Sequence, residues 1–114
     1  MENTGGRAAA ALPLSDSDLV ALLRNATVPV VVDFWSPWCS PCRAVSAIVS
    51  ELALEFGEQV VVATVNTVAH PEAAARFEVT SVPTVIAFVG GAPVRRLIGA
   101  RPKSHFLREI SALL

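Results

Sequence analysis

The sequence of 114 residues contains no tyrosine, one methionine and only two cysteines. Charged residues make up just 17% of it, and nine basic residues nearly balance ten acidic ones, for a net charge of −1. Because no basic excess is present, we expect neither nucleic acid nor an acidic membrane surface as a partner. The longest apolar runs, at residues 30–32, 60–63 and 85–89, fall far short of the ~20 residues that a membrane-spanning helix needs.

Hydrophobic residues make up 53% of the composition, which excludes an intrinsically disordered chain, and the length suits one domain. Residues 1–13 include Gly5-Gly6 and an alanine run but no packing pattern. We therefore expect a flexible arm there and a single domain over residues 14–114. The N-terminus lacks the basic segment and the long apolar core of a secretory signal, so we expect a cytoplasmic protein, and a monomer.

Hydrophobic spacing predicts four helices and four strands. The helices are expected over residues 15–25, 39–57, 72–77 and 103–114, and the strands over residues 28–35, 60–66, 84–89 and 94–99. Residues 90–93 join the last two strands, which predicts a hairpin whose turn is slightly longer than two residues. The order α-β-α-β-α-β-β-α predicts an α/β fold with a central mixed sheet of four main strands and helices on both faces.

The two cysteines stand together in the segment Trp38-Cys39-Ser40-Pro41-Cys42. A structural disulfide closing so short a loop would stabilise the fold by only roughly 2 kcal/mol, and a reducing cytoplasm disfavours it. A structural zinc ion needs four ligands, but no second cysteine pair exists and the two histidines, His70 and His105, have no motif spacing. We expect no metal, although two chains sharing one metal site stays an alternative.

Redox chemistry explains the cysteine pair better than either structural role, because the predicted strand ends at Trp35 and, after a short connection, the next helix starts at about Cys39. Unpaired backbone N–H groups and the helix dipole at such a position favour an anionic thiolate, which is the nucleophile in disulfide exchange. Cys42 lies one turn further on, on the same side and less exposed, where it can reach the Cys39 sulfur. Pro41 stiffens the first turn, where its missing N–H costs little.

At these residues the sequence resembles the thioredoxin family, over about residues 15–114. The resemblance rests on Val32-Asp33-Phe34-Trp35, the cysteine segment, Ser81-Val82-Pro83-Thr84, Gly90-Gly91 and Gly99-Ala100. A Cys-x-x-Cys alone is weak evidence. Its place after an Asp-Phe-Trp strand, with Val-Pro-Thr further along the chain, makes the match specific. The resemblance implies the thioredoxin fold.

The resemblance also implies a function, protein-disulfide reduction, with Cys39 attacking, Cys42 resolving and a Cys39–Cys42 disulfide in the oxidised form. Pro83 matches a cis-proline that faces the cysteines, although an ordinary trans turn is the alternative. Trp38 matches an indole beside the site, although it could be a core aromatic. The client-binding surface would comprise Trp38, Ser40, Pro41, Val82, Pro83 and Gly99. No cofactor would be bound, and a thioredoxin reductase would supply electrons from NADPH to reduce disulfide-containing clients.

Asp33 interrupts the most apolar predicted strand. A carboxylate buried there is costly, so its pKa should rise and it should be able to accept the proton of Cys42. It matches the buried aspartate of the family and is the third expected catalytic residue. The alternative is an aspartate at a strand end that reaches solvent.

The sequence departs from the common family pattern at four positions: Ser40 stands for glycine, Ala47 for proline, Thr64 for lysine and Val68 for an acidic residue. The lysine replaced by Thr64 approaches the buried aspartate in many members, and Arg43 or Arg76 could take its place. These departures bear on reduction potential, client range and reductase recognition. A second function stays open, a binding subunit or redox sensor whose cysteines cycle rarely and whose apolar surface around Trp38 holds one partner.

Overall fold

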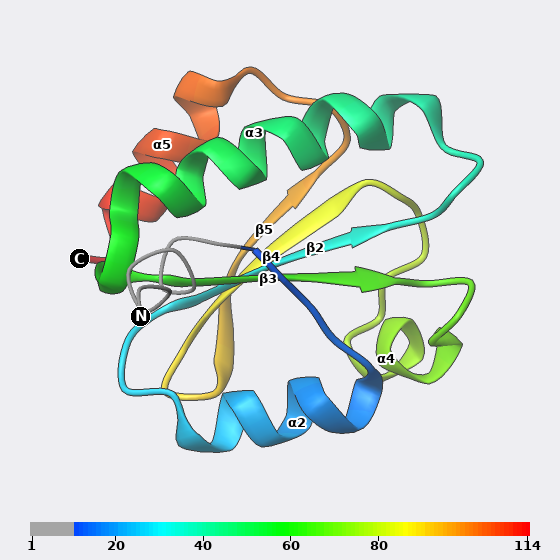
Figure 1. Cartoon of the computed structure of the whole chain (residues 1–114), viewed down its shortest axis with the longest axis horizontal. Coiled ribbons are helices and arrows are strands. Elements are labelled where there is room, and N and C mark those ends of the chain that lie inside the picture. The colour runs from blue at the N-terminus through cyan, green and yellow to red at the C-terminus, as the bar shows by residue number, and fades with distance from the viewer. Residues whose placement is uncertain (1–10) are drawn as a thin grey trace, which may run out of the picture.

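Five strands form one mixed sheet, and helices cover both of its faces (Figure 1). The computed structural model describes residues 11–114. Its elements are β1 (Leu12–Pro13), α2 (Asp16–Asn25), β2 (Val30–Trp35), α3 (Ser40–Phe56), the 3₁₀ turn Gly57–Gln59, β3 (Val61–Asn66), α4 (Pro71–Arg76), β4 (Thr84–Val89), β5 (Ala92–Ile98) and α5 (Lys103–Ser111). The predicted α/β class, with a mixed sheet between two helical layers, is confirmed.

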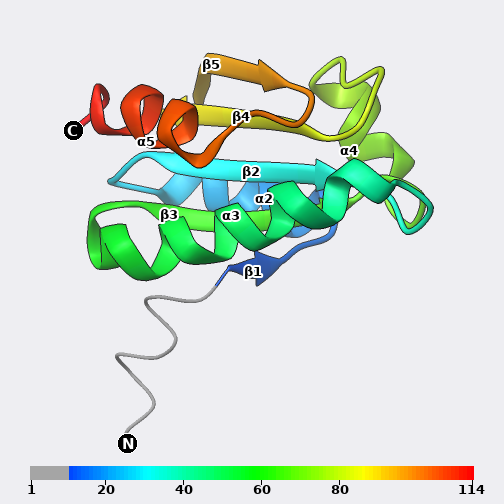
Figure 2. The same cartoon turned by 90° about the horizontal axis from the view of Figure 1, so that it is seen from above.

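The strands lie in the order β1-β3-β2-β4-β5. β2 pairs in parallel with β3 and antiparallel with β4, so it occupies the centre of the sheet. Helices α3 and α5 lie on one face, and α2 and α4 lie on the other (Figures 1 and 2). No helix of the described chain has both the length and the apolar character needed to cross a membrane.

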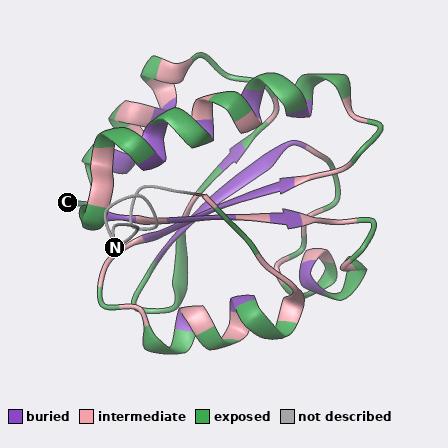
Figure 3. Cartoon of the chain, viewed as in Figure 1, coloured by how far each residue is buried: buried purple, intermediate pink, exposed green. Residues whose placement is uncertain are grey.

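Strand β2 is buried on both faces, which explains its nearly unbroken apolar sequence (Figure 3). Val31 belongs to the core cluster that includes α3 and α5 side chains. Val30, Val32 and Phe34 belong to the cluster that includes α2 side chains. Because side chains alternate along a strand, Asp33 shares the face of Val31 and lies beneath α3.

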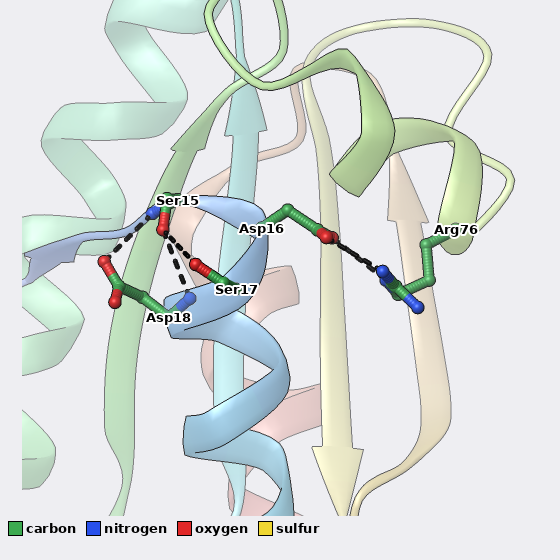
Figure 4. A network of polar contacts seen from close by, with 5 residues as sticks. All are labelled: Ser15, Asp16, Ser17, Asp18 and Arg76. Atoms are coloured by element: carbon green, nitrogen blue, oxygen red, sulfur yellow. Dashed lines mark hydrogen bonds and ion pairs between the residues drawn. The ribbon is translucent and has the colours of Figure 1, made fainter.

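The start of α2 follows from its sequence. The Ser15 hydroxyl accepts the backbone N–H of Asp18 at 3.2 Å, and the Asp18 carboxylate accepts the backbone N–H of Ser15, which forms a capping box (Figure 4). Asp16 then accepts two hydrogen bonds from Arg76, at 2.9 and 2.8 Å, and joins α2 to α4. The predicted helix start at Ser15 is confirmed, as is the end of α3 at Gly57, whose φ is +55°.

Residues 12–13 correct the predicted arm, because they form the fifth strand. Leu12 pairs with Ala63 and Pro13 with Thr64 of β3, and the Leu14 N–H donates to the Thr64 carbonyl at 2.9 Å. Two residues carry no periodicity that would reveal a strand, and a proline is tolerated at a sheet edge. The ordered fold therefore starts before residue 14, and residues 1–10 of the predicted arm lie outside the described residues.

The hairpin turn is tighter than predicted. Gly90 and Gly91 alone form it, with φ values of +61° and +82°, and the next two residues already belong to β5. Positive φ at both central positions matches the twist of the flanking strands, which allows a two-residue turn. Pro93, expected to belong to the turn, pairs with Phe88 in the sheet.

Glu78 has an unfavourable backbone conformation at the end of α4. Its φ is +57°, in the left-handed region, while its N–H donates to the Ala75 carbonyl and the Val79 N–H donates to the Ala74 carbonyl at 2.8 Å. This is a Schellman ending, in which glycine is preferred at the position of Glu78. We expect Glu78→Gly to raise the free energy of unfolding by about 0.5–1 kcal/mol, measured by urea denaturation of the oxidised protein.

The matched control is Glu78→Ala, which removes the carboxylate but keeps the Cβ that makes this φ unfavourable. Its free energy of unfolding should stay close to that of the wild type. Equal stability of the glycine and alanine variants would show that the backbone conformation of Glu78 costs nothing.

Candidate active site

The cysteine pair lies where the central strand leads into the longest helix. β2 ends at Trp35, and Cys39 is the N-cap residue of α3. The two sulfurs form a disulfide, with the Cα atoms 5.3 Å apart, and the Cys39 sulfur also accepts the backbone N–H of Cys42 at 3.2 Å. Cys42 is only 2% exposed, whereas Cys39 is half-buried. The site therefore presents one sulfur to the outside and holds the other inside.

The loop before β4 lies at the same end of the sheet. Thr84 pairs with Phe34, so Pro83 is placed beside the end of β2 from which the cysteine segment departs. The Val82–Pro83 peptide bond is cis, which excludes the ordinary trans turn. The Gly99 N–H donates to the Pro83 carbonyl at 2.9 Å, so Pro83 and Gly99 are directly linked.

The remaining residues of the expected client surface differ in exposure. Trp38 is 82% exposed, which excludes a core role for it. Ser40 and Pro41 are exposed in the first turn of α3, and Val82 is half-buried beside the buried Pro83. The outer wall of the site thus offers one large apolar side chain next to the more accessible cysteine.

A pocket of about 370 Å³ opens beside the cysteines. Its walls come from the end of β2, the start of α3 and the middle of β3, and are formed by Trp35, Ser36, Pro37, Cys39, Cys42, Arg43, Ser46 and Thr64. It brings the half-buried Cys39, the buried Cys42 and a helical hydroxyl to one space.

Asp33 is fully buried next to this pocket, which excludes the solvent-exposed alternative. Its Oδ2 accepts a hydrogen bond from the Ser46 hydroxyl at 2.9 Å, and its Oδ1 has no hydrogen-bond partner among the described residues. Burial disfavours the charged carboxylate and raises the pKa of Asp33 to about 6, although the Ser46 hydrogen bond opposes this rise. Near neutral pH, such a group can both accept and release a proton.

In the described part of the chain, no cation takes the place of the missing lysine in direct contact with Asp33. Thr64 is the β3 residue paired with Asp33 and also lines the pocket. Arg76 is bound to Asp16 on the other face of the sheet, so it is excluded (Figure 4). Arg43 lines the pocket, but within residues 11–114 no ion pair involves Asp33.

The sequence analysis did not identify Ser46, which forms the only side-chain hydrogen bond to Asp33 among the described residues. Its signal was present, because Ser46 follows Cys42 by four residues and so lies on the same side of the helix. Ser46 also places a hydroxyl between Val45 and Val49, two positions that the apolar spacing of the helix predicts to be buried.

Together, these features define a class of protein. A disulfide at a helix N-terminus, with unequal access to its two sulfurs and a buried carboxyl group nearby, is the site of a thiol-disulfide oxidoreductase. The described residues contain no group of three or more metal-ligating side chains.

Comparison with known proteins gives the family. The thioredoxin family model matches residues 10–112. A thioredoxin of Mycolicibacterium smegmatis is 41% identical over 107 residues, covering 92% of this chain and 96% of its own length. Thioredoxin 1 of a Nostoc species is 40% identical over 95 residues, covering 83% and 89%. The chain belongs to the thioredoxin family, and its sheet and helices are the thioredoxin fold.

A further relative is a fusion. The bifunctional thioredoxin reductase/thioredoxin of Mycobacterium leprae is 40% identical over 100 residues, which cover 88% of this chain but only 22% of the length of that protein. Membership in the family makes this chain a thiol-disulfide oxidoreductase that reduces protein disulfides. Thioredoxins keep their redox equivalents in the cysteine pair and bind no cofactor.

Proposed function

We propose that this protein is a general reductant of disulfide-containing client proteins in which Cys39 attacks and Cys42 resolves. The observation that carries the assignment is the difference in access, because Cys42 is 2% exposed and Cys39 is half-buried at the helix start. A client disulfide can approach only the more accessible sulfur. The N–H of Cys42, which already donates to the Cys39 sulfur, would stabilise negative charge on it.

The reaction then runs in two exchanges. The Cys39 thiolate attacks one client sulfur, forms a mixed disulfide and releases the other client sulfur as a thiolate. Cys42 gives up its proton, with Asp33 as the base, and attacks the Cys39 sulfur. The Cys39–Cys42 disulfide forms, the second client sulfur leaves as a thiolate, and two electrons have passed to the client.

The client-binding surface in this proposal comprises Trp38, Ser40, Pro41, Val82, Pro83 and Gly99. Its support is the exposure of Trp38 and the hydrogen bond that joins Gly99 to Pro83. An exposed indole gives apolar contact area at little cost in conformational entropy, which suits a surface that meets many partners.

The Cys39–Cys42 disulfide must be reduced again before the next client can be reduced. A thioredoxin reductase would return electrons from NADPH to the Cys39–Cys42 disulfide. The Mycobacterium leprae relative supports this, because its name joins both activities in one chain. We place the protein in the cytoplasm as a monomer, where a reducing poise suits net reduction of clients.

The test is reduction of insulin by catalytic amounts of the protein, with dithiothreitol as donor and, separately, with NADPH and a bacterial thioredoxin reductase. We expect many insulin disulfides to be reduced per protein molecule in both assays. A binding subunit or redox sensor, the alternative function, would reduce at most one disulfide per protein molecule. Turnover with dithiothreitol but not with the enzyme would reject the reductase as partner and keep the client chemistry.

A further inference from the structure

Ser46 occupies a unique place between the buried carboxyl group and the cysteines. Among the described residues, it alone both hydrogen-bonds Asp33 and lines the pocket that Cys42 lines. It follows Cys42 by one helical turn, so the two side chains lie on one side of α3. Asp33 itself is fully buried and is not among the residues that line the pocket.

The other elements around Asp33 offer one further hydroxyl, that of Thr64, which lines the pocket but forms no hydrogen bond with Asp33. Its partners in the sheet are Thr64 of β3 and Val85 of β4. The titratable or charged groups facing this region are the two cysteines and Arg43, all from the start of α3 and all lining the pocket. Arg43 is exposed and forms no hydrogen bond with the carboxyl group.

We propose that the Ser46 hydroxyl relays the proton from the Cys42 thiol to Asp33 when the mixed disulfide is resolved. The proposal deepens the function above and rests on Asp33 acting as the base. The hydroxyl gives its own proton to Oδ2 of Asp33 and receives the thiol proton of Cys42, directly or through one water in the pocket. The Cys42 thiolate then attacks the Cys39 sulfur, and the client sulfur leaves with the bonding electron pair.

The geometry explains why a hydroxyl serves here. A hydroxyl both donates and accepts, whereas a lysine ammonium only donates. Ser46 therefore does two things at once: it stabilises the charged carboxylate, and it connects a buried acid to a space that the acid does not reach. Because no described residue donates to Oδ1, Oδ2 is the carboxylate oxygen that faces Ser46.

The first test measures the pKa of Asp33 in the oxidised protein, where no thiol titrates, from the ¹³C shift of its carboxyl carbon. Ser46→Ala removes the only hydrogen-bond donor to this carboxylate within residues 11–114, so we expect the pKa to rise by about one pH unit, a tenfold change in the proton equilibrium. Ser46→Thr keeps the hydroxyl and should stay near the wild type. Ser50→Ala makes the same change on the exposed side of α3 and should have no effect.

The second test follows the decay of the mixed disulfide with a disulfide peptide, under single-turnover conditions with acid quenching and mass spectrometry. We expect Asp33→Asn to slow this decay by about 100-fold or more, since a general base contributes at least that factor. Ser46→Ala should slow it by about tenfold and move its pH profile to higher pH, with Ser46→Thr restoring both.

The possible results distinguish the Ser46 relay from the assignment of Asp33 as the base. If Asp33→Asn slows resolution while Ser46→Ala matches the wild type in rate and pH profile, the relay is wrong and the base assignment stands. If neither variant slows resolution, both are wrong. A slower Ser46→Ala that Ser46→Thr does not restore would also overturn the relay, because bulk rather than the hydroxyl would then be responsible.

Discussion

Replacing Cys42 with serine should turn a catalyst into a trap. The variant keeps Cys39 at the N-terminus of α3, so it should still attack client disulfides, but no second thiol can release the client. Mixed disulfides should therefore accumulate to one client per protein, and turnover of insulin should be lost. Non-reducing electrophoresis and mass spectrometry of the adducts measure the result.

The opposite variant gives the control. Cys39→Ser leaves only Cys42, which is 2% exposed and cannot meet a client disulfide without local opening. It should form no mixed disulfide and show no turnover, although both variants lack one sulfur and the disulfide alike. Adducts on the Cys39→Ser protein, at a yield like that of Cys42→Ser, would reverse the assignment of attacking and resolving sulfur.

The central fold was predictable because burial on both faces leaves a clear trace in the sequence. The apolar run that ends at Trp35 has no solvent-facing positions, and this placed β2 inside a sheet with helices on both sides. Helix starts were equally legible, since the capping residue Ser15 and the first-turn aspartates act locally. Periodicity and caps are properties of neighbouring residues, which is why the sequence records them.

Features that depend on strand pairing between segments far apart in the sequence were not predictable in the same way. Leu12 and Pro13 form a strand because the edge of β3 accepts them, although proline is depleted in strands. The sequence predicts a longer turn at Gly90-Gly91 because proline is typical of turns, whereas Pro93 pairs with Phe88 in the sheet.

The active-site residues also differ in how far the sequence reveals them. The cysteine segment and Asp33 stand out in sequence because their residue types conflict with their surroundings, a polar group in an apolar strand or a thiol at a helix start. Ser46 does not stand out, because a serine near the edge of a helical apolar stripe is ordinary. Its significance comes from the hydrogen bond to Asp33, thirteen positions earlier in the chain.

Asp33 should weaken the fold at the pH where it serves catalysis. Burial raises its pKa from 3.8 in the unfolded chain to about 6 in the folded protein. Below pH 3.8 both states hold the proton, and Asp33 costs nothing. Between these two values the unfolded state ionises first, so the folded state loses stability as pH rises. Above pH 6 the loss reaches about 3 kcal/mol and stays constant.

We therefore expect Asp33→Ala in the oxidised protein to gain about 2–3 kcal/mol of stability at pH 8 relative to its effect at pH 4. The substitution also leaves a cavity and removes the Ser46 hydrogen bond. The parts of these two effects on the free energy of unfolding that do not depend on pH cancel when the two pH values are compared. Thr64→Lys, which restores a cation beside the carboxylate, should shrink the difference by lowering the pKa of Asp33. Urea denaturation at each pH gives the free energies.

Asp16 provides a control of opposite sign. Its carboxylate accepts two hydrogen bonds from Arg76, which lower its pKa, so its contribution to stability is present at neutral pH and is lost as pH falls through the folded value. Asp16→Ala should therefore destabilise more at pH 8 than in acid well below pH 3.8, whereas Asp33→Ala should destabilise less at pH 8 than in that acid. If Asp33→Ala instead destabilises more at pH 8 than in acid, as Asp16→Ala should, the raised pKa of Asp33 is wrong, and with it the reason that this carboxyl group can take a thiol proton near neutral pH.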